Sequence, residues 1–314
     1  MSFTKFPNFQ KFSLDDATEY LKYYIRLSDA YSDFSLDDLS IWLNYNDDLT
    51  ICKLEDNLVI KFSNVLDENR IYYSLLGISQ LESTLDILSA YSKKQDEPLR
   101  LFYLTQEAND AIERLERQDI TIEEDTNNSD YVYNVEDLIN MHGKPYENFR
   151  RRINHFTREN KNIQTIEFDL SSSTDKEIIE SNIIKWSAKT SFRNDPESWE
   201  LRVIKRHLEL AGDLPVFAYG LLSDDKLINI NIFNMPPQKG WLIFNHIKCD
   251  YEYPDVYGYA FYNLFLIAQS KGIKWVNFEQ DLGKEGLRRI KTFFRPERML
   301  KRYIATFDGD STYQ

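Results

Sequence analysis

The sequence NFEQDLGKEGLRRIK, from Asn277 to Lys291, decides the fold of the chain. The residues just before it, from Ile273 onward, are apolar and partly β-branched, which predicts a short buried strand ending at Phe278. Two carboxylates, two glycines and a basic run at helical spacing follow at once. In open α/β sheets, ligands bind at the carboxyl ends of strands, so we expect a binding crevice at this turn.

Two interpretations of the turn stay open at this point. In the first, Glu279 and Asp281 are the acidic groups of an active site. In the second, they cap the following helix, and Arg288, Arg289 and Lys291 form its solvated face. The residue types fit both interpretations equally well.

Composition bounds the class of protein. The 314 residues suffice for two domains with a core each, and 42% hydrophobic with 28% charged residues is typical of globular proteins. Cys52 and Cys249 lie far apart, and the four histidines include no pair at metal-ligand spacing, so we expect no disulfide framework and no metal site. Met1 to Lys11 lacks the apolar core of a signal peptide, and no apolar run is long enough for a transmembrane segment. We therefore expect a cytoplasmic location.

The net charge of −13 is unevenly distributed. Residues 144–161 hold six Lys or Arg against two Glu, and residues 284–302 hold eight against two. These two basic islands carry +4 and +6, which leaves −23 on the rest of the chain. Two basic islands on an acidic body favour one local anionic ligand over the coating of a nucleic acid.

Hydrophobic periodicity predicts two α+β units, residues 1–128 and 129–314, joined by a polar connector that begins at Glu123. The first unit is expected to have helices at 14–26, 80–91 and 106–116 and strands at 49–54, 58–62, 71–75 and 99–104. The second is expected to have helices at 146–160, 174–190, 199–211 and 256–270 and strands at 163–170, 216–222, 227–233, 241–247, 273–278 and 300–306. The strand–helix–strand order over 241–278 implies a parallel crossover.

A second candidate binding feature is the run Tyr257-Gly258-Tyr259, which opens a helix directly after a strand. Free backbone N–H groups and the helix dipole at such a turn favour a phosphate or another anion. Lys248, at the end of the preceding strand, would add a cation. The alternative is that Gly258 only allows close packing of the helix on the sheet.

Three motifs span most of the chain in order. The last and most specific is Asn277 to Lys291, together with Phe294, Pro296, Leu300 and Tyr303. The central one runs from Tyr131-Val132-Tyr133 to Phe156, and the first from Tyr31-Ser32-Asp33-Phe34 to Trp42. These motifs resemble those of a bacterial family related to the catalytic domain of phosphatidylglycerol lysyltransferase. The order of meander, strand, glycine-opened helix and strand also resembles acyltransferases of the Gcn5-related type.

The resemblance implies an α+β protein of two tandem Gcn5-related N-acyltransferase-like domains. Each would be a mixed, mostly antiparallel sheet flanked by helices, with the active groove mainly in the second. It further implies transfer of an activated acyl or aminoacyl group to an amine or hydroxyl acceptor, such as a small molecule or a lipid headgroup. The donor would be acyl-CoA or an aminoacyl-tRNA whose acceptor stem meets the basic residues 284–302. A cradle with a single glycine favours a charged-tRNA donor or no coenzyme at all.

Under this interpretation the candidate site residues fall into three groups. Acyl transfer needs a base near the acceptor, so Glu279 and Asp281 are the candidate catalytic groups, and either could instead bind the ammonium of an aminoacyl donor. The residues expected to hold the donor or another anion are Lys248, Tyr257, Gly258, Arg288 and Lys291. The expected groove residues are Arg151, Arg152, Asn154, His155, Asn263 and Asn277. For His155 we favour an interaction with a helix over catalysis.

Other function classes were compared with the transferase. A non-catalytic ligand-binding or regulatory protein that retains the duplicated fold stays open. A hydrolase has little support, because the chain has no Gly-x-Ser-x-Gly elbow. His246 and Cys249 are three residues apart on one expected strand and therefore face opposite sides.

Overall fold

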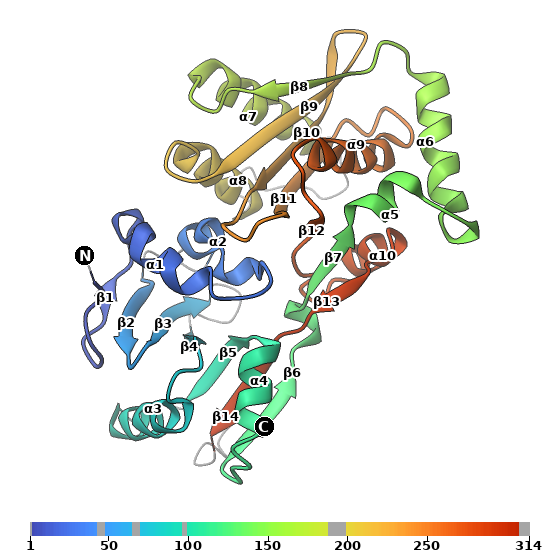
Figure 1. The fold of residues 1–314 in the computed structure, drawn as a ribbon. Helices are drawn as coiled ribbons and strands as arrows, with labels where there is room; N and C mark the ends of the chain where they lie inside the picture. The colour runs from blue at the N-terminus through green and yellow to red at the C-terminus, as the bar shows by residue number, and fades with distance from the viewer. Residues whose placement is uncertain (1, 43–47, 65–69, 96–98, 188–198, 308–314) are drawn as a thin grey trace. The chain divides into compact units, whose positions relative to one another are not determined.

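The computed structural model describes residues 2–42, 48–64, 70–95, 99–187 and 199–307 (Figure 1). The chain divides into two compact units. Unit 1 comprises Met1–Asp130, Gln280–Arg288 and Met299–Gln314, and unit 2 comprises Tyr131–Glu279 and Arg289–Arg298. Each unit is built on one seven-stranded sheet, and each sheet is mixed and mostly antiparallel, as the sequence predicts.

The sheet of unit 1 has the strand order β1-β2-β3-β4-β5-β14-β6. β4 and β5 pair in parallel, and the other neighbouring strands are antiparallel. The last strand, β14, lies between β5 and β6, whereas the sequence places it at the end of the second unit. The strands are β1 (Gln10–Lys11), β2 (Thr50–Leu54), β3 (Asn57–Asn64), β4 (Arg70–Leu76), β5 (Arg100–Leu104), β6 (Ile120–Glu124) and β14 (Tyr303–Phe307).

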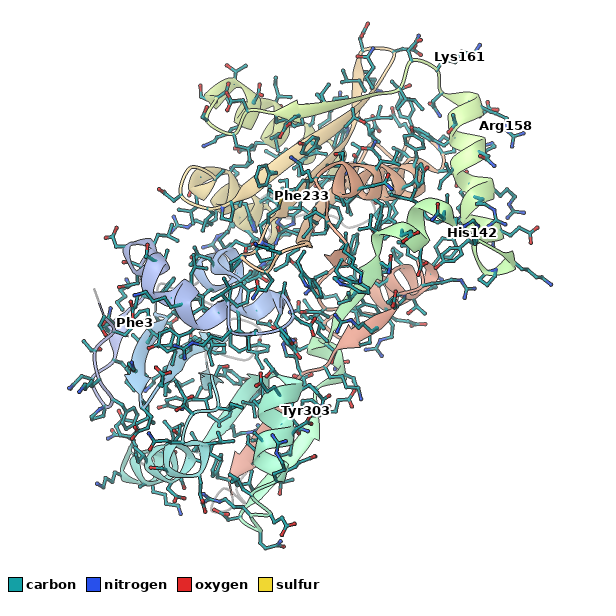
Figure 2. All side chains as sticks on the ribbon, in the orientation of Figure 1. Phe3, His142, Arg158, Lys161, Phe233 and Tyr303 are labelled. Atoms are coloured by element: carbon teal, nitrogen blue, oxygen red, sulfur yellow. The ribbon has the colours of Figure 1, made fainter. Side chains whose placement is uncertain are left out.

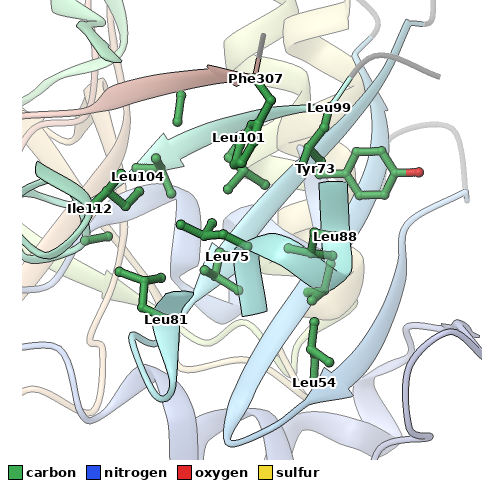
Figure 3. Close-up of a cluster of buried hydrophobic side chains, with 14 of the residues drawn as sticks. Leu54, Tyr73, Leu75, Leu81, Leu88, Leu99, Leu101, Leu104, Ile112 and Phe307 are labelled. Carbon is green, nitrogen blue, oxygen red and sulfur yellow. The ribbon is translucent and has the colours of Figure 1, made fainter. Parts of the chain in front are cut away.

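Helices α3 (Leu81–Gln95) and α4 (Gln106–Glu113) supply one side of the unit 1 core (Figure 3). Leu81, Leu85 and Leu88 recur at helical spacing, so α3 has one apolar face. That face joins a cluster of buried side chains with Leu101 and Leu104 of β5. Burial of each leucine contributes about 1.5–3 kcal/mol, so these contacts hold α3 against the sheet. The remaining helices of unit 1 are α1 (Ala17–Tyr24) and α2 (Leu36–Ile41).

The sheet of unit 2 has the strand order β13-β7-β12-β11-β10-β9-β8. The strands are β7 (Asp130–Asn134), β8 (Gln164–Phe168), β9 (Val216–Ser223), β10 (Lys226–Asn234), β11 (Trp241–Cys249), β12 (Trp275–Asn277) and β13 (Arg298–Leu300). The helices are α5 (Val135–Asn140), α6 (Glu147–Glu159), α7 (Ser173–Ser187), α8 (Trp199–Leu210) and α9 (Val256–Ser270), and helix α10 (Glu285–Phe293) begins in unit 1 and enters unit 2 at Arg289. The end of the helix expected at 174–190 lies outside the described residues.

Helices cover both faces of β11 in unit 2. Ile247 and Cys249 pack with Val256 and Ala260 of α9, so these strand residues face α9. Side chains alternate along a strand, so Lys248 and His246 face the other way. There the Nε2 of His246 lies 3.2 Å from the Nδ1 of His207 on α8. The strand therefore presents two chemically different faces.

The two units repeat one topology. In unit 1 the meander β2-β3-β4 leads through α3 to β5, which pairs in parallel with β4. In unit 2 the meander β9-β10-β11 leads through α9 to β12, which pairs in parallel with β11. The duplication is one of strand order, and this explains why the sequence shows no strict repeat.

A buried ion cluster anchors the last strand within unit 1. The Arg302 guanidinium, fully buried, lies with its Nη2 2.5 Å from an Asp33 carboxylate oxygen and 3.1 Å from an Asp130 oxygen. Its centre is 4.3 Å from the ring of Tyr31. The Ser32 backbone N–H and hydroxyl both donate to Asp130. Arg302 belongs to the second basic island of the sequence, but in the structure it is an internal tie between the N-terminal motif and β14.

Replacing Arg302 by leucine should destabilise unit 1 by about 3–5 kcal/mol, because two buried carboxylates would lose their partner. Lys301→Ala is the matched control, since the neighbouring Lys301 pairs with Glu124 at the surface and such pairs contribute about 0–1 kcal/mol. Hydrogen exchange of unit 1 amides, followed by mass spectrometry, measures the stability of unit 1 in both variants. Equal protection in the two variants would contradict the anchoring role.

The cluster also predicts a pH dependence. Burial raises the pKa of Asp33 to about 6, against the opposing attraction of Arg302 and with the support of Asp130. Asp33 therefore stays protonated in the native state between roughly pH 4 and 6, where the unfolded chain is ionised, so this residue makes stability fall as pH rises through that window. In Asp33→Asn this fall should vanish, which makes the variant more stable relative to wild type at pH 7 than at pH 4, by about 2 kcal/mol. A stability difference that is constant with pH would refute the assignment.

Candidate active site

The candidate site forms where β11 and β12 separate. The two strands pair over only three positions, Trp241↔Trp275, Leu242↔Val276 and Ile243↔Asn277. Beyond them β11 continues to Cys249, while the chain after Asn277 turns away. Asn245 is skipped in the pairing of β11 with β10, which runs from Phe233↔Phe244 to Ile232↔His246. Such a bulge is common beside active sites because it redirects a side chain.

Glu279 lies at this separation in a strained backbone conformation. Its φ is 56°, in the left-handed region that a non-glycine residue adopts only at a cost of about 1–3 kcal/mol. Its carboxylate accepts a hydrogen bond from the Asn245 side-chain amide at 2.9 Å, and its backbone N–H donates to the Asn277 side chain at 2.7 Å. Asn277 is fully buried. The half-buried carboxylate is therefore aimed by two asparagines from two strands.

Lys291 holds the same turn through a hydrogen bond to the residue before Glu279. Its side chain is 8% exposed, and its ammonium donates to the Phe278 carbonyl at 2.6 Å. The Tyr133 hydroxyl, on β7, donates to the Lys291 carbonyl at 2.8 Å. The sequence predicts Lys291 as an anion-binding residue, but the structure gives its ammonium a backbone carbonyl as partner. It is a positioning residue for the peptide that precedes Glu279.

Asp281 and Arg288 lie in the segment of unit 1 that follows. The Asp281 carboxylate is fully buried and accepts from Arg288 through both oxygens, at 2.7 and 3.0 Å. It also accepts from the Gly283 backbone N–H at 2.8 Å. A carboxylate held by two guanidinium nitrogens and a backbone amide fixes the start of α10. The contacts of Asp281 and Arg288 are those of the capping interpretation, whereas for Glu279 the active-site interpretation stays a prediction.

Lys248 and Gly258 lie on opposite faces of the unit 2 sheet. The Lys248 ammonium is 2.5 Å from the Glu200 carboxylate of α8, whereas Gly258 is in α9, which covers the other face. On the Lys248 side, burial together with His207 and Lys248 holds the pKa of His246 well below its usual value, so this histidine is neutral. The structure therefore does not combine Lys248 with the first turn of α9 in one anion site.

Side chains of α6 occupy the space over the first turn of α9. A methyl group added at Gly258 would lie 3.8 Å from the Phe149 ring and 4.0 Å from the Arg152 Cβ. The His155 ring nitrogen is 3.0 Å from the Asp255 carboxylate that precedes the helix. Gly258 is buried against α6. The contact of His155 with the helix start, which the sequence favours over catalysis, is what the structure contains.

The other predicted donor and groove residues are distributed over unit 2. The Tyr257 ring stacks with Phe294 at 6.1 Å, and burial raises its pKa. Asn263 lies inside the core, where its amide donates to the Thr165 hydroxyl at 2.9 Å. Arg151, Arg152 and Asn154 are exposed on α6. Among the interactions described above, Asn277 is the one predicted groove residue that forms a hydrogen bond with Glu279.

Asn245 is the site residue that sequence reasoning missed. The signal was available, because asparagine is depleted in strands and this region has four of them in strand patterns. They are Asn229, Asn231, Asn234 and Asn245. Asn234 donates to Asn245 at 3.4 Å, so the polar row continues across two strands.

Two classes of site were searched for directly. Within the described ranges, no group of three or more His, Cys, Asp or Glu side chains is placed to hold a metal ion. No helix in the described part of the chain is long and apolar enough to cross a bilayer.

Comparison with known proteins identifies one matching family and several solved structures with a similar fold. The family model described as phosphatidylglycerol lysyltransferase, C-terminal, matches residues 41–306. No curated protein matches in sequence. A conserved protein of unknown function from Bacteroides thetaiotaomicron has a TM-score of 0.82 at 20% identity, over 96% of this chain and 99% of that one.

Two further solved structures share the fold. L-PGS from Bacillus licheniformis has a TM-score of 0.59 at 13% identity, over 86% of this chain and 87% of that one. FemX has a TM-score of 0.62 at 7% identity, over 96% and 97%. These identities establish the fold alone. The expected fold class, two tandem Gcn5-related N-acyltransferase-like units, is confirmed.

The packing of α6 on α9 generates a prediction about Gly258. Gly258→Ala should be tolerated, because its Cβ fits at ordinary contact distances, and should stabilise α9 by about 0.5–1 kcal/mol. Binding of acyl-CoA, if any, should be unchanged in a thermal-shift titration. The control is Gly220→Ala, whose Cβ would lie 2.8 Å from Leu227 and 2.9 Å from Phe168, and which should destabilise by about 1–3 kcal/mol. If Gly258→Ala stays folded but no longer binds acyl-CoA, then Gly258 belongs to a phosphate-binding site after all.

Proposed function

The chain belongs to the phosphatidylglycerol lysyltransferase C-terminal family, and from this premise we propose that it transfers an aminoacyl group from an aminoacyl-tRNA to an amine or hydroxyl acceptor. Glu279 is the proposed general base. The observation that carries the proposal is the Glu279 carboxylate, strained in its backbone and aimed by Asn245 where β11 and β12 separate.

The proposed step uses one proton transfer to and from Glu279. The acceptor nitrogen or oxygen attacks the ester carbonyl of the donor while the Glu279 carboxylate takes its proton. When the bond between that carbonyl and the 3′ ribose oxygen breaks, the proton passes to the leaving oxygen. The Asn245 amide, 2.9 Å from the carboxylate, keeps it in one orientation through the cycle.

The packing of α6 supports a charged tRNA over acyl-CoA as the donor. A coenzyme A pyrophosphate would be bound by free N–H groups at the start of a helix. At α9 the side chains of Phe149 and Arg152 pack beside Gly258, at 3.8 and 4.0 Å from where its Cβ would lie, and so narrow this position. His155 and Asp255, 3.0 Å apart, hold the cover in place. The family name supports aminoacyl over simple acyl transfer.

The proposed acceptor is a small molecule or a lipid headgroup that carries an amine or hydroxyl. The family name supports a lipid headgroup. Cys52 and Cys249 are both free and buried thiols, which supports the reducing cytoplasm as the compartment of the reaction.

Glu279→Gln should lower the transfer rate by about 10²–10⁴-fold, the usual contribution of a general base, and leave the melting temperature unchanged. The assay uses tRNA charged with labelled lysine or with other labelled amino acids, with a cell extract as the source of acceptors. Label lost from tRNA and gained by acceptor is counted. The matched control is Glu297→Gln, an exposed glutamate of the same unit.

Two results would count against the proposal. If Glu279→Gln transfers the aminoacyl group at the full wild-type rate, then Glu279 is not the general base. Absence of transfer by the wild-type protein with every charged tRNA would instead favour a non-catalytic protein that retains the duplicated fold.

A further inference from the structure

Unit 2 contains a basic pocket that the proposed chemistry does not use. It has a volume of about 620 Å³ and lies between the start of α6 and the end of α10. Each of the two basic islands of the sequence contributes to it. The lining residues are Lys144, Pro145, Glu147, Asn148, Phe149, Arg151, Thr292, Phe293 and Arg295.

The cations of the pocket are oriented but not neutralised. Arg151 donates to the Asn148 side chain at 2.5 Å, and Arg295 donates to the Pro145 carbonyl at 2.9 Å. Within the described residues, neither of them nor Lys144 forms an ion pair with a carboxylate. Elsewhere in this acidic chain, cations such as Arg117 and Lys248 do form such pairs. With Glu147 included, the pocket keeps a formal charge of +2.

Helix α6 extends this charge along one exposed face. Arg152 and Arg158 are exposed, and so is Lys161 just beyond the helix. Figure 2 shows Arg158 on the outer side of α6 and Lys161 in the segment just beyond the end of the helix. The apolar face of the helix, with Phe149 and Phe156, is buried against α9. Because the apolar face of the helix is already covered, the helix has no apolar face to insert into a lipid surface, and its exposed cations are left to contact the phosphates of a polyanion.

An aromatic ring adds a second recognition element. Phe293 lines the pocket, and the guanidinium of Arg152 lies 5.1 Å from the centre of its ring. The guanidinium therefore covers one face of the ring, and its outer plane can stack on an unpaired base while its N–H groups meet a phosphate.

We infer that the pocket between α6 and α10, with the exposed face of α6, binds the RNA of the donor at its unpaired end. The inference rests on the proposed function for the identity of that RNA. It makes Arg151 and Arg295 binding residues, distinct from Glu279, which acts on the reacting group.

The test measures binding of uncharged tRNA and therefore does not depend on catalysis. In the double variant Arg151→Glu/Arg295→Glu, affinity at about 0.1 M salt should fall by at least tenfold, and the dependence of log K on log salt should flatten by about 2. The control is Lys185→Glu/Arg206→Glu, which changes the net charge equally on the exposed surfaces of α7 and α8. Thermal melting checks that both variants fold.

The outcomes separate this inference from the function. Unchanged tRNA binding in the pocket variant would overturn the inference, whether or not the protein transfers aminoacyl groups. Weakened tRNA binding supports it even if no transfer is found, in which case only the proposed function fails. A pocket variant that binds tRNA normally but loses binding to phosphatidylglycerol vesicles would overturn it in favour of a lipid site.

Discussion

The early end of the parallel pairing between β11 and β12 is the constraint on which the unit 2 site depends. After Ile243↔Asn277 the two strands no longer share hydrogen bonds, so side chains must satisfy what the backbones do not. At the point of separation the Asn277 side chain accepts a hydrogen bond from the Glu279 backbone N–H, and the Asn245 amide donates to the Glu279 carboxylate. The buried ammonium of Lys291 fixes the Phe278 carbonyl one residue earlier. A carboxylate held in this way keeps one orientation and remains half exposed, which is what a proton acceptor for an incoming substrate needs.

The two units share a topology, but their described residues differ at the parallel pair. β4 and β5 of unit 1 also pair in parallel, through Tyr73↔Leu101. The residues around that pair, such as Tyr73, Leu101 and Leu104, belong to the apolar core of unit 1. Unit 1 instead has a cluster of buried charged side chains, in which Arg302 pairs with Asp33 and Asp130 and ties the N-terminal motif to the last strand. One copy of the fold thus carries an accessible acid, and the other carries an internal ion cluster.

Much of this could be predicted from sequence. The periodic patterns located α9 at its observed bounds and predicted the parallel crossover into β12. Glu279 and Asp281 could not be separated, because they are two residues apart and chemically alike, and only the tertiary partners Asn245 and Arg288 distinguish them. The burial of Arg302 and the cover that α6 places over Gly258 also depend on contacts distant in sequence. The basic islands indicated an anionic ligand, but their meeting in one pocket required the packing of α6 near the end of α10.

If Glu279 is the general base, the reacting carbonyl of the donor must lie beside it, and a single structure can decide this. The direct measurement is a crystal structure of the protein with a lysyl-adenosine in which an amide replaces the labile ester. The account predicts that the amide carbonyl lies beyond Ile243 and Asn277, with the Glu279 carboxylate within hydrogen-bond reach of the position from which an acceptor attacks. A ligand bound in unit 1, or in unit 2 with its carbonyl remote from Glu279, would contradict it.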